Sequence, residues 1–237
     1  MTPTPAILVT YTTLRELTSA ELALIPPEEL QRVTEIGAQR RQQEYLCGRA
    51  LLRNTLERWT GEPAISHRLT TTKRGKPECV DGPALSVTHS GNLVACAVTD
   101  CGDIGIDLEV PKRSRRTTDI ARSYFSSEEA SWLATQPVDR FHMLWVLKEA
   151  CLKSIGLGLG GLDRFCFKVL PPKIEATIKD DSIQSLGLYA MGEALLALAT
   201  RHFSLQEVKF EFWGPGAMGP VPDSGFRPIA KTNDVAG

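Results

Sequence analysis

The sequence lacks an excess of charge of either sign. Its 27 lysines and arginines are balanced by 28 aspartates and glutamates, which gives a formal net charge of −1. Such a balance excludes bulk attraction to nucleic acid or to membrane surfaces, so any anion site must come from local clustering. No run of apolar residues approaches the length of about 18 that a membrane span requires. The N-terminal stretch MTPTPAILVTYTTL also lacks the basic and apolar regions of a signal peptide.

The cysteines are few and show no spacing of a metal site or a disulfide framework. Six cysteines occur, and none forms a C-x-x-C pair. This pattern argues against a structural zinc site and favours reduced thiols. The sequence therefore predicts a cytoplasmic protein.

What the chain does have is an ordinary globular composition, with 42% hydrophobic and 23% charged residues. Two short segments, RALLR (49–53) and EACLK (149–153), resemble each other within Ala/Leu-rich stretches that strands follow. This likeness predicts an α+β fold of two similar halves, residues 1–103 and 104–213. The Gly/Pro-rich residues 214–237 are expected to form an extended tail.

Hydrophobic periodicity and turn residues predict the main elements. Helices are expected at about 27–37, 40–60, 118–135 and 140–155. Strands are expected at 6–10, 84–87, 93–98 and 104–110, and in the segments RFCFKVL, IEATI and EALLALAT. A turn, THSGN, is expected between the strands at 84–87 and 93–98.

Paired carboxylates stand out in the segment GIDLEV. Asp107 and Glu109 alternate with Ile106 and Leu108, so both acids point to the same face of a strand. Like charges held this close repel each other unless a cation lies between them, and oxygen ligands of this kind suit Mg²⁺. The alternative is the solvent face of an amphipathic edge strand, and this pattern alone does not decide between them.

A second group lies on the helix expected at 140–155. Trp145, Glu149 and Lys153 recur every four residues and share one face. The plain alternative is an exposed Glu–Lys pair, which stabilises a helix by only about 0.2–0.5 kcal/mol. The glycines that follow match G-x-G-x-x-G at Gly156, Gly158 and Gly161, but they follow a helix instead of opening one. They therefore predict a helix C-terminus and not a dinucleotide site.

Two turns could bind an anion. The segment KRGKP (73–77) places three basic residues around a glycine, and THSG (88–91) places two hydroxyls and an imidazole together. Backbone N–H groups with nearby lysines favour phosphate. An exposed basic turn and a surface histidine are the alternatives, and both stay open.

Taken in order, these segments resemble a known enzyme family. R-x-x-x-R on an early helix is followed by GKP, THSG, GIDLE, FSSEE and WVLKEACLK. The series resembles the 4′-phosphopantetheinyl transferases, and within them the large monomeric type that activates surfactin synthetase. The likeness covers roughly residues 40–170 in motif order, and GIDLE with W-x-x-K-E-A-x-x-K is its most specific part.

The resemblance implies both a fold and a reaction. The fold is two similar α+β halves related by a pseudo-twofold axis, with the active site in the cleft between them. The reaction moves the 4′-phosphopantetheine arm of coenzyme A to a serine of an apo acyl or peptidyl carrier protein and releases 3′,5′-ADP. A monomeric, cytoplasmic protein that binds neither nucleic acid nor membrane is implied as well.

The resemblance also implies residue roles. The ligands of Mg²⁺, with Mn²⁺ as a second possibility, are Asp107, Glu109 and Glu149. The catalytic residues are Glu149, Lys153 beside the pyrophosphate, and Glu129 of the F-S-x-x-E motif, and Lys148 is expected to border the site. Coenzyme A contacts are implied for Arg49 and His89 at the 3′-phosphate, for Gly75, Lys76 and Pro77 at the adenine, and for Thr88, which stands where many relatives carry serine.

Two other functions stay open, a non-catalytic module that binds coenzyme A or a carrier protein, and a Mg²⁺-dependent nucleotide phosphohydrolase. Three converging acids argue against a pure binder, which does not need them. The basic residues at 112–116 are a candidate patch for an acidic carrier protein, and a solvated loop is the alternative.

Overall fold

The computed structural model describes residues 7–111, 116–179, 182–205, 207–214, 221–222 and 225–232. Contacts divide the chain into two compact units, residues 1–101 with 207–224 and residues 102–206 with 225–237. Each unit combines a β-sheet with helices, so the predicted α+β class is confirmed. Within the described part of the chain, no helix combines the length and the apolar character that crossing a membrane demands.

The first unit is a five-stranded sheet with the long helix α3 packed on it. Its strand order is β12-β11-β1-β5-β4, and a small hairpin of β2 and β3 stands apart. Strand β1 pairs antiparallel with β5 and parallel with β11, so a late segment completes the sheet of the N-terminal unit. The elements are β1 (Ile7–Thr13), α1 (Ser19–Leu22), α2 (Pro27–Gln31), η1 (Arg32–Glu35), α3 (Gln39–Thr60), η2 (Ala64–Ser66), β2 (Leu69–Thr71), β3 (Pro77–Cys79), β4 (Ala84–Ser90), β5 (Leu93–Thr99), β11 (Val208–Phe212) and β12 (Val221–Pro222).

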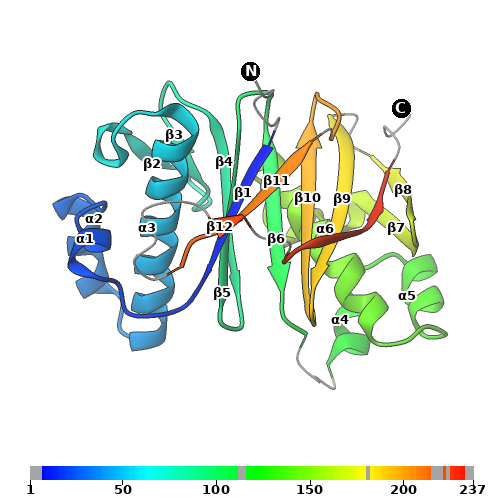
Figure 1. Cartoon of the computed structure of the whole chain (residues 1–237). Coiled ribbons are helices and arrows are strands. Elements are labelled where there is room, and N and C mark those ends of the chain that lie inside the picture. Colours follow the sequence, from blue (N-terminus) through cyan, green and yellow to red (C-terminus); the bar gives the residue numbers. More distant parts are fainter. Residues whose placement is uncertain are drawn as a thin grey trace. The chain divides into compact units, whose positions relative to one another are not determined.

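Apolar residues at helical spacing explain why α3 packs on this sheet. Its buried face meets the buried residues of β5 in one hydrophobic cluster, which includes Leu51, Leu56, Val94 and Val98. The helix ends where Gly61 adopts a left-handed conformation, as the predicted stop requires. Figure 1 shows α3 lying beside β4 and β5.

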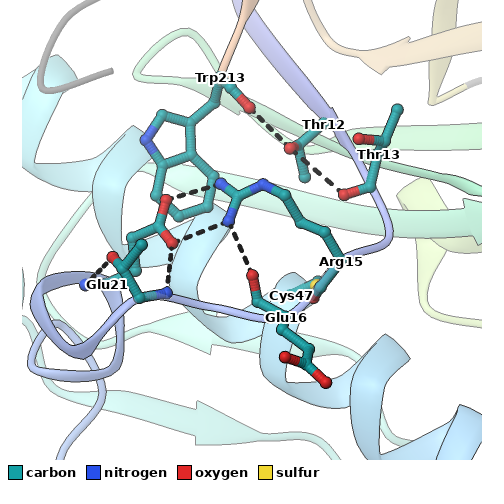
Figure 2. Close-up of polar contacts among 8 residues, drawn as sticks. Thr12, Thr13, Arg15, Glu16, Glu21, Cys47 and Trp213 are labelled. Atoms are coloured by element: carbon teal, nitrogen blue, oxygen red, sulfur yellow. Dashed lines mark hydrogen bonds and ion pairs between the residues drawn. The ribbon is translucent and has the colours of Figure 1, made fainter. Parts of the chain in front are cut away.

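A cluster around Arg15 holds the end of β11 to the same unit (Figure 2). The Arg15 guanidinium donates two hydrogen bonds to the Glu21 carboxylate, at 2.6 and 2.8 Å. It also lies 5.2 Å from the centre of the Trp213 ring, and the Thr12 hydroxyl donates to the Trp213 carbonyl at 2.6 Å. The ion pair raises the pKa of Arg15 and lowers that of Glu21, so both groups are charged where they meet.

The second unit is a six-stranded sheet covered by helix α6. Its strand order is β6-β10-β9-β13-β8-β7, and Figure 1 shows α6 beside β9 and β10. The elements are β6 (Ile104–Glu109), α4 (Thr117–Tyr124), α5 (Ser127–Leu133), α6 (Asp139–Ile155), η3 (Leu159–Arg164), β7 (Phe165–Leu170), β8 (Lys173–Ile178), β9 (Ile183–Met191), β10 (Ala194–Arg201) and β13 (Arg227–Lys231).

The packing of α6 on β6 is unusually close because it depends on a glycine. A Cβ at Gly105 would lie 1.9 Å from the backbone oxygen of Ala150 and 2.4 Å from the backbone nitrogen of Ser154. The helix backbone therefore lies almost directly on the strand at this position. Side chains alternate along a strand, so the Asp107 and Glu109 side chains point towards the same helix.

Three sequence expectations differ from the structure. The helix expected at 118–135 is two helices, because Ser126 begins α5 with a capping box to Glu129. Thr88 and His89 lie on strand β4 and not in a turn, since the pairing of β4 with β5 extends to Ser90. The segment after residue 213, expected as an extended tail, contributes β12 and β13 to the two sheets.

The glycine helix exit is confirmed. Helix α6 ends at Ile155, and Gly156 caps it in the left-handed conformation with φ of 68°. Leu157 then donates its N–H to the Leu152 carbonyl at 2.9 Å, which completes the C-terminal turn.

The contact at Gly105 predicts that Gly105→Ala is strongly destabilising. The added methyl meets helix backbone that cannot rotate away, so we expect the free energy of unfolding to fall by about 3 kcal/mol or more. Gly48→Ala on α3 is the matched control, because its nearest neighbour is Val87 Cγ1 at 3.9 Å. That variant should keep or gain stability, by up to about 1 kcal/mol. Urea unfolding of both variants measures the difference, and equal midpoints would contradict this account of the packing.

Candidate active site

An acidic pair with a lysine lies where β6 meets α6. The Lys153 ammonium donates to Asp107 Oδ1 at 2.6 Å, and Asp107 is only 7% exposed. The predicted common face of Glu149 and Lys153 is therefore turned to the strand, and both side chains are partly buried. The plain alternative of an exposed helical Glu–Lys pair does not describe this arrangement.

The environment at the contact of β6 and α6 shifts the pKa of the Glu149 carboxyl group. Burial raises its pKa to about 7, with a further contribution from the negative charge of Asp107, and Lys153 acts in the opposite direction. A group with a pKa near neutrality can accept a proton and later release it. The effect of Asp107 also shows that these two carboxylates lie close enough to repel each other.

Glu109 shares the strand face of Asp107 but points to a different neighbour. Its side chain is 28% exposed, and its Oε1 lies 3.9 Å from His142 Nδ1. His142 is on α6, two turns before Glu149, so its side chain follows the same face of the helix. Burial lowers the pKa of His142, which favours a neutral imidazole beside Glu109.

The chemistry of these carboxylates fits a divalent cation. The Asp107 and Glu149 oxygens are hard donors whose mutual repulsion a cation would relieve, and this donor set suits Mg²⁺. Over the described ranges, however, no three His, Cys, Asp or Glu side chains form a closed metal-binding group. The donor chemistry therefore fits, and the complete ligand set with Glu109 stays a prediction.

Glu129 lies in a different environment from the one expected of a catalytic acid. It is fully buried, and its Oε1 accepts from the Phe167 N–H at 2.8 Å. Its Oε2 accepts from Lys148 at 2.9 Å and from the Ser126 N–H at 3.1 Å. Both oxygens are thus used to join α5 to α6 and β7, which is a structural role and differs from the predicted catalysis through water.

Lys148 likewise lies inside the second unit, although it was expected to border the site. Its ammonium is completely buried and donates to the carbonyls of Leu162 and Phe165 as well as to Glu129. It also lies 4.7 Å from the Phe125 ring centre. The helical rotation of about 100° per residue explains how Lys148 enters the core while Glu149 meets β6.

In the first unit, Arg49 lines a cavity of about 490 Å³. Its Nε lies 3.9 Å from Glu29 Oε2, and its guanidinium lies 5.4 Å from the centre of the Tyr45 ring. Arg53 binds the same Glu29 at 2.6 Å and is almost fully buried. The cavity is lined by four arginines and a histidine and also by the carboxylates of Glu28 and Glu29; the basic residues are Arg32, Arg49, Arg53, His67 and Arg68.

The predicted adenine-binding turn is the tip of the β2–β3 hairpin. Gly75 has a φ of 87° and donates its N–H to the Thr72 carbonyl at 2.9 Å. The Thr72 N–H donates to the Lys76 carbonyl, and Pro77 begins β3. This backbone conformation favours glycine, which adopts it without a Cβ clash. Strand β2 of the hairpin contributes Thr70 and Thr71 to the Arg49 cavity.

Thr88 and His89 occupy opposite faces of β4. Thr88 is buried, whereas the His89 side chain is exposed and its Nδ1 lies 3.8 Å from Glu44 Oε2. His89 is therefore accessible to an anion, and Thr88 is less so. Of the predicted basic patch at 112–116, residues 112–115 lie outside the described residues, and Arg116 precedes α4 as its N-cap.

Sequence reasoning missed two residues that shape the site. Alternation along β6 places Gly105 on the face of Asp107, but nothing in one sequence shows that a helix contacts it. His142 falls outside the motifs, although its position two turns before Glu149 is a signal that could have found it. The roles of Gly105 and His142 can be recognised only once it is known that α6 packs on β6.

Comparison with known proteins gives consistent matches. The family model of the 4′-phosphopantetheinyl transferase superfamily matches residues 103–194. The model of the 4′-phosphopantetheinyl transferase N-terminal domain matches residues 28–99. The two matches follow one another along the chain in that family's order.

Individual relatives carry the same description. A candidate 4′-phosphopantetheinyl transferase of Synechocystis sp., slr0495, is 31% identical over 169 residues, which is 68% of each chain. HetI of Nostoc sp., a 4′-phosphopantetheinyl transferase, is 26% identical over 81% of this chain and 83% of its own. Sfp of Bacillus subtilis, also a 4′-phosphopantetheinyl transferase, is 31% identical over 62% of this chain and 68% of its own.

The raised pKa of Glu149 predicts a pH-dependent stability. Its folded pKa of about 7 exceeds the unfolded value of about 4.3, so ionisation of Glu149 opposes folding. The loss begins above the unfolded pKa and is complete above the folded pKa. In EDTA, Glu149→Gln should therefore gain about 1–3 kcal/mol of stability relative to wild type between about pH 5 and pH 8.

Urea unfolding across this pH range measures that difference. Glu128→Gln is the control, because the Glu128 carboxylate is exposed and its pKa is lowered by Lys168. The Glu128→Gln difference from wild type should stay constant from about pH 5 to pH 8. A Glu149→Gln difference that is equally constant would show that Glu149 is not held in a raised-pKa environment.

Proposed function

The chain belongs to the 4′-phosphopantetheinyl transferase superfamily, and from this premise we propose the reaction that it catalyses. It transfers the 4′-phosphopantetheine arm of coenzyme A to a serine of an apo acyl or peptidyl carrier protein and releases 3′,5′-ADP. The observation that carries the proposal is the group of Asp107, Glu149 and Lys153 at the contact of β6 and α6. The proposal also includes Mg²⁺ as the metal, a monomeric state and a cytoplasmic location, which rest on the sequence and the resemblance.

The mechanism follows from the charges of these residues. Glu149, directly or through a water beside the metal, accepts the proton of the carrier serine as the serine oxygen bonds to the β-phosphorus of coenzyme A. The bond from that phosphorus to the 3′,5′-ADP oxygen breaks at the same centre. The Lys153 ammonium, at the same strand–helix contact, stabilises the negative charge that moves to the leaving oxygen.

A metal fits this scheme through the side chains already described. Asp107, Glu109 and Glu149 are the residues that would hold Mg²⁺. When bound, the ion supplies positive charge that polarises the phosphoryl group and offsets charge on its oxygens. Lys153 then has the phosphate oxygens as an alternative partner to Asp107.

The first unit supplies groups suited to the nucleotide. The cavity beside Arg49 contains several guanidinium groups, which bind phosphate through charge-assisted hydrogen bonds. The internal hydrogen bonds of the Gly75 turn hold Lys76 and Pro77 at the tip of the hairpin, where the adenine contact is predicted. That a single coenzyme A molecule engages both units stays a prediction from the family resemblance.

Glu149→Gln should abolish transfer, because the amide cannot take the serine proton. We expect turnover of an apo carrier protein with coenzyme A and Mg²⁺ to fall by about 10²–10⁴. Intact mass spectrometry of the carrier measures the added arm. Glu128→Gln, on the exposed side of α5, should keep wild-type turnover.

This assay also separates the alternative functions. A shifted carrier mass supports transfer, release of 3′,5′-ADP without a carrier supports a phosphohydrolase, and neither product supports a binding module. Wild-type turnover in a folded Glu149→Gln variant would remove Glu149 from the catalytic role.

Arg49→Met should raise the apparent KM for coenzyme A by about 10- to 100-fold, which is the usual worth of one charge-assisted contact to phosphate. The same variant should leave the KM for 3′-dephospho-coenzyme A nearly unchanged, because that substrate lacks the phosphate in question. Steady-state kinetics with both substrates measures the two effects. Equal increases with both substrates would mean that Arg49 supports the fold of the cavity and not the 3′-phosphate.

A further inference from the structure

One buried polar group near the acidic pair has no role in the motifs discussed so far. His142 is 6% exposed, and its Nδ1 has no hydrogen-bond partner in the part of the chain that the structure covers. A buried nitrogen without a partner lowers stability and is uncommon in folded proteins. Its position next to a predicted metal ligand therefore calls for an explanation.

Two carboxylates influence this ring, Asp139 on the same helix and Glu109 on β6. Glu109 Oε1 lies 3.9 Å from His142 Nδ1, which is about 1 Å longer than a hydrogen bond. The Glu109 side chain is 28% exposed, whereas that of His142 is 7% exposed, so Glu109 is the less confined of the two. The Phe141 ring packs edge-on against the His142 ring, with 5.3 Å between the ring centres.

The strand and the helix run in opposite directions at this contact. Gly105 lies against Ala150 and Ser154, Asp107 against Lys153, and Glu109 against His142. From Gly105 to Glu109 along β6, the contacted residues of α6 thus change from Ala150 and Ser154 to His142. His142 occupies the helix position that faces Glu109, just as Lys153 occupies the one that faces Asp107.

We propose that His142 is a positioning residue, which donates Nδ1–H to Glu109 and orients that carboxylate on the face shared with Asp107 and Glu149. This proposal rests on the proposed function, because it gives Glu109 the role of a metal ligand. Nδ1 can carry a hydrogen in either charge state of the imidazole, so the role does not depend on titration. Outer partners of this kind restrict the rotation of a ligand, and their loss typically weakens metal binding by about 10- to 100-fold.

Binding of Mn²⁺ to the full chain, followed by electron paramagnetic resonance in the absence of coenzyme A, tests the proposal. His142→Phe keeps the volume of a ring but removes the donor, and it should weaken Mn²⁺ binding by about tenfold or more. His142→Asn places an amide N–H near the position of Nδ1 and should restore binding to within about threefold of wild type, since the hydrogen bond to the ligand is regained. Unchanged binding in His142→Phe, or no recovery in His142→Asn, would overturn the proposal.

A double-mutant cycle separates positioning from general support of the fold. In a Glu109→Gln background, His142→Phe should cause no further loss of Mn²⁺ binding, because the partner carboxylate is gone. An equal loss in both backgrounds would assign His142 to the fold of α6 and contradict the proposal. Urea midpoints of the variants are measured alongside.

The failure of this idea is distinguishable from failure of the proposed function. Mn²⁺ binding that follows the expected pattern supports the role of His142 even if no carrier protein is modified. Conversely, the wild-type protein could transfer the arm while the His142→Phe variant binds Mn²⁺ as tightly as wild type. That result would leave the proposed function in place and overturn the role of His142.

Discussion

The close contact of α6 with β6 at Gly105 is the constraint on which the candidate site depends. Only a residue without a Cβ allows the Ala150 carbonyl and the Ser154 nitrogen to lie so near the strand. Because the helix backbone is this close, Lys153 reaches Asp107 at 2.6 Å. The same closeness removes water from Glu149, and burial is the main cause of its raised pKa.

The opposite side of α6 is held by a second group of charges. Lys148 follows the helix into the core and binds Glu129 together with two backbone carbonyls. Removing one member of a buried pair leaves an uncompensated charge, which typically costs about 3–5 kcal/mol. The rotation of α6 about its axis is therefore restricted from both sides, at Gly105 and at Lys148. Glu149, the next residue after Lys148, has its direction set by this restriction.

The local part of this arrangement could be predicted from sequence. Alternation placed Asp107 and Glu109 on one strand face, and four-residue spacing placed Glu149 and Lys153 on one helix face. Periodicity states which side chains share a face, but not which surface covers that face. The contact with Gly105, the inward direction of Lys148 and the pairing of β13 with β9 are interactions between distant segments. No local pattern encodes them, and a single sequence therefore leaves them open.

Glu129 and Glu149 show how environment separates two acids of the same unit. The Glu129 oxygens accept from Lys148 and from the backbone N–H groups of Ser126 and Phe167, so both oxygens already have donors. The Glu149 carboxyl instead lies beside the negative Asp107, and its pKa rises to about 7. A carboxylate can accept a proton near neutral pH in an environment like that of Glu149, and not in one like that of Glu129. Of the two acids, Glu149 therefore has the environment that the proposed proton transfer needs, whereas Glu129 holds the helix that carries Glu149.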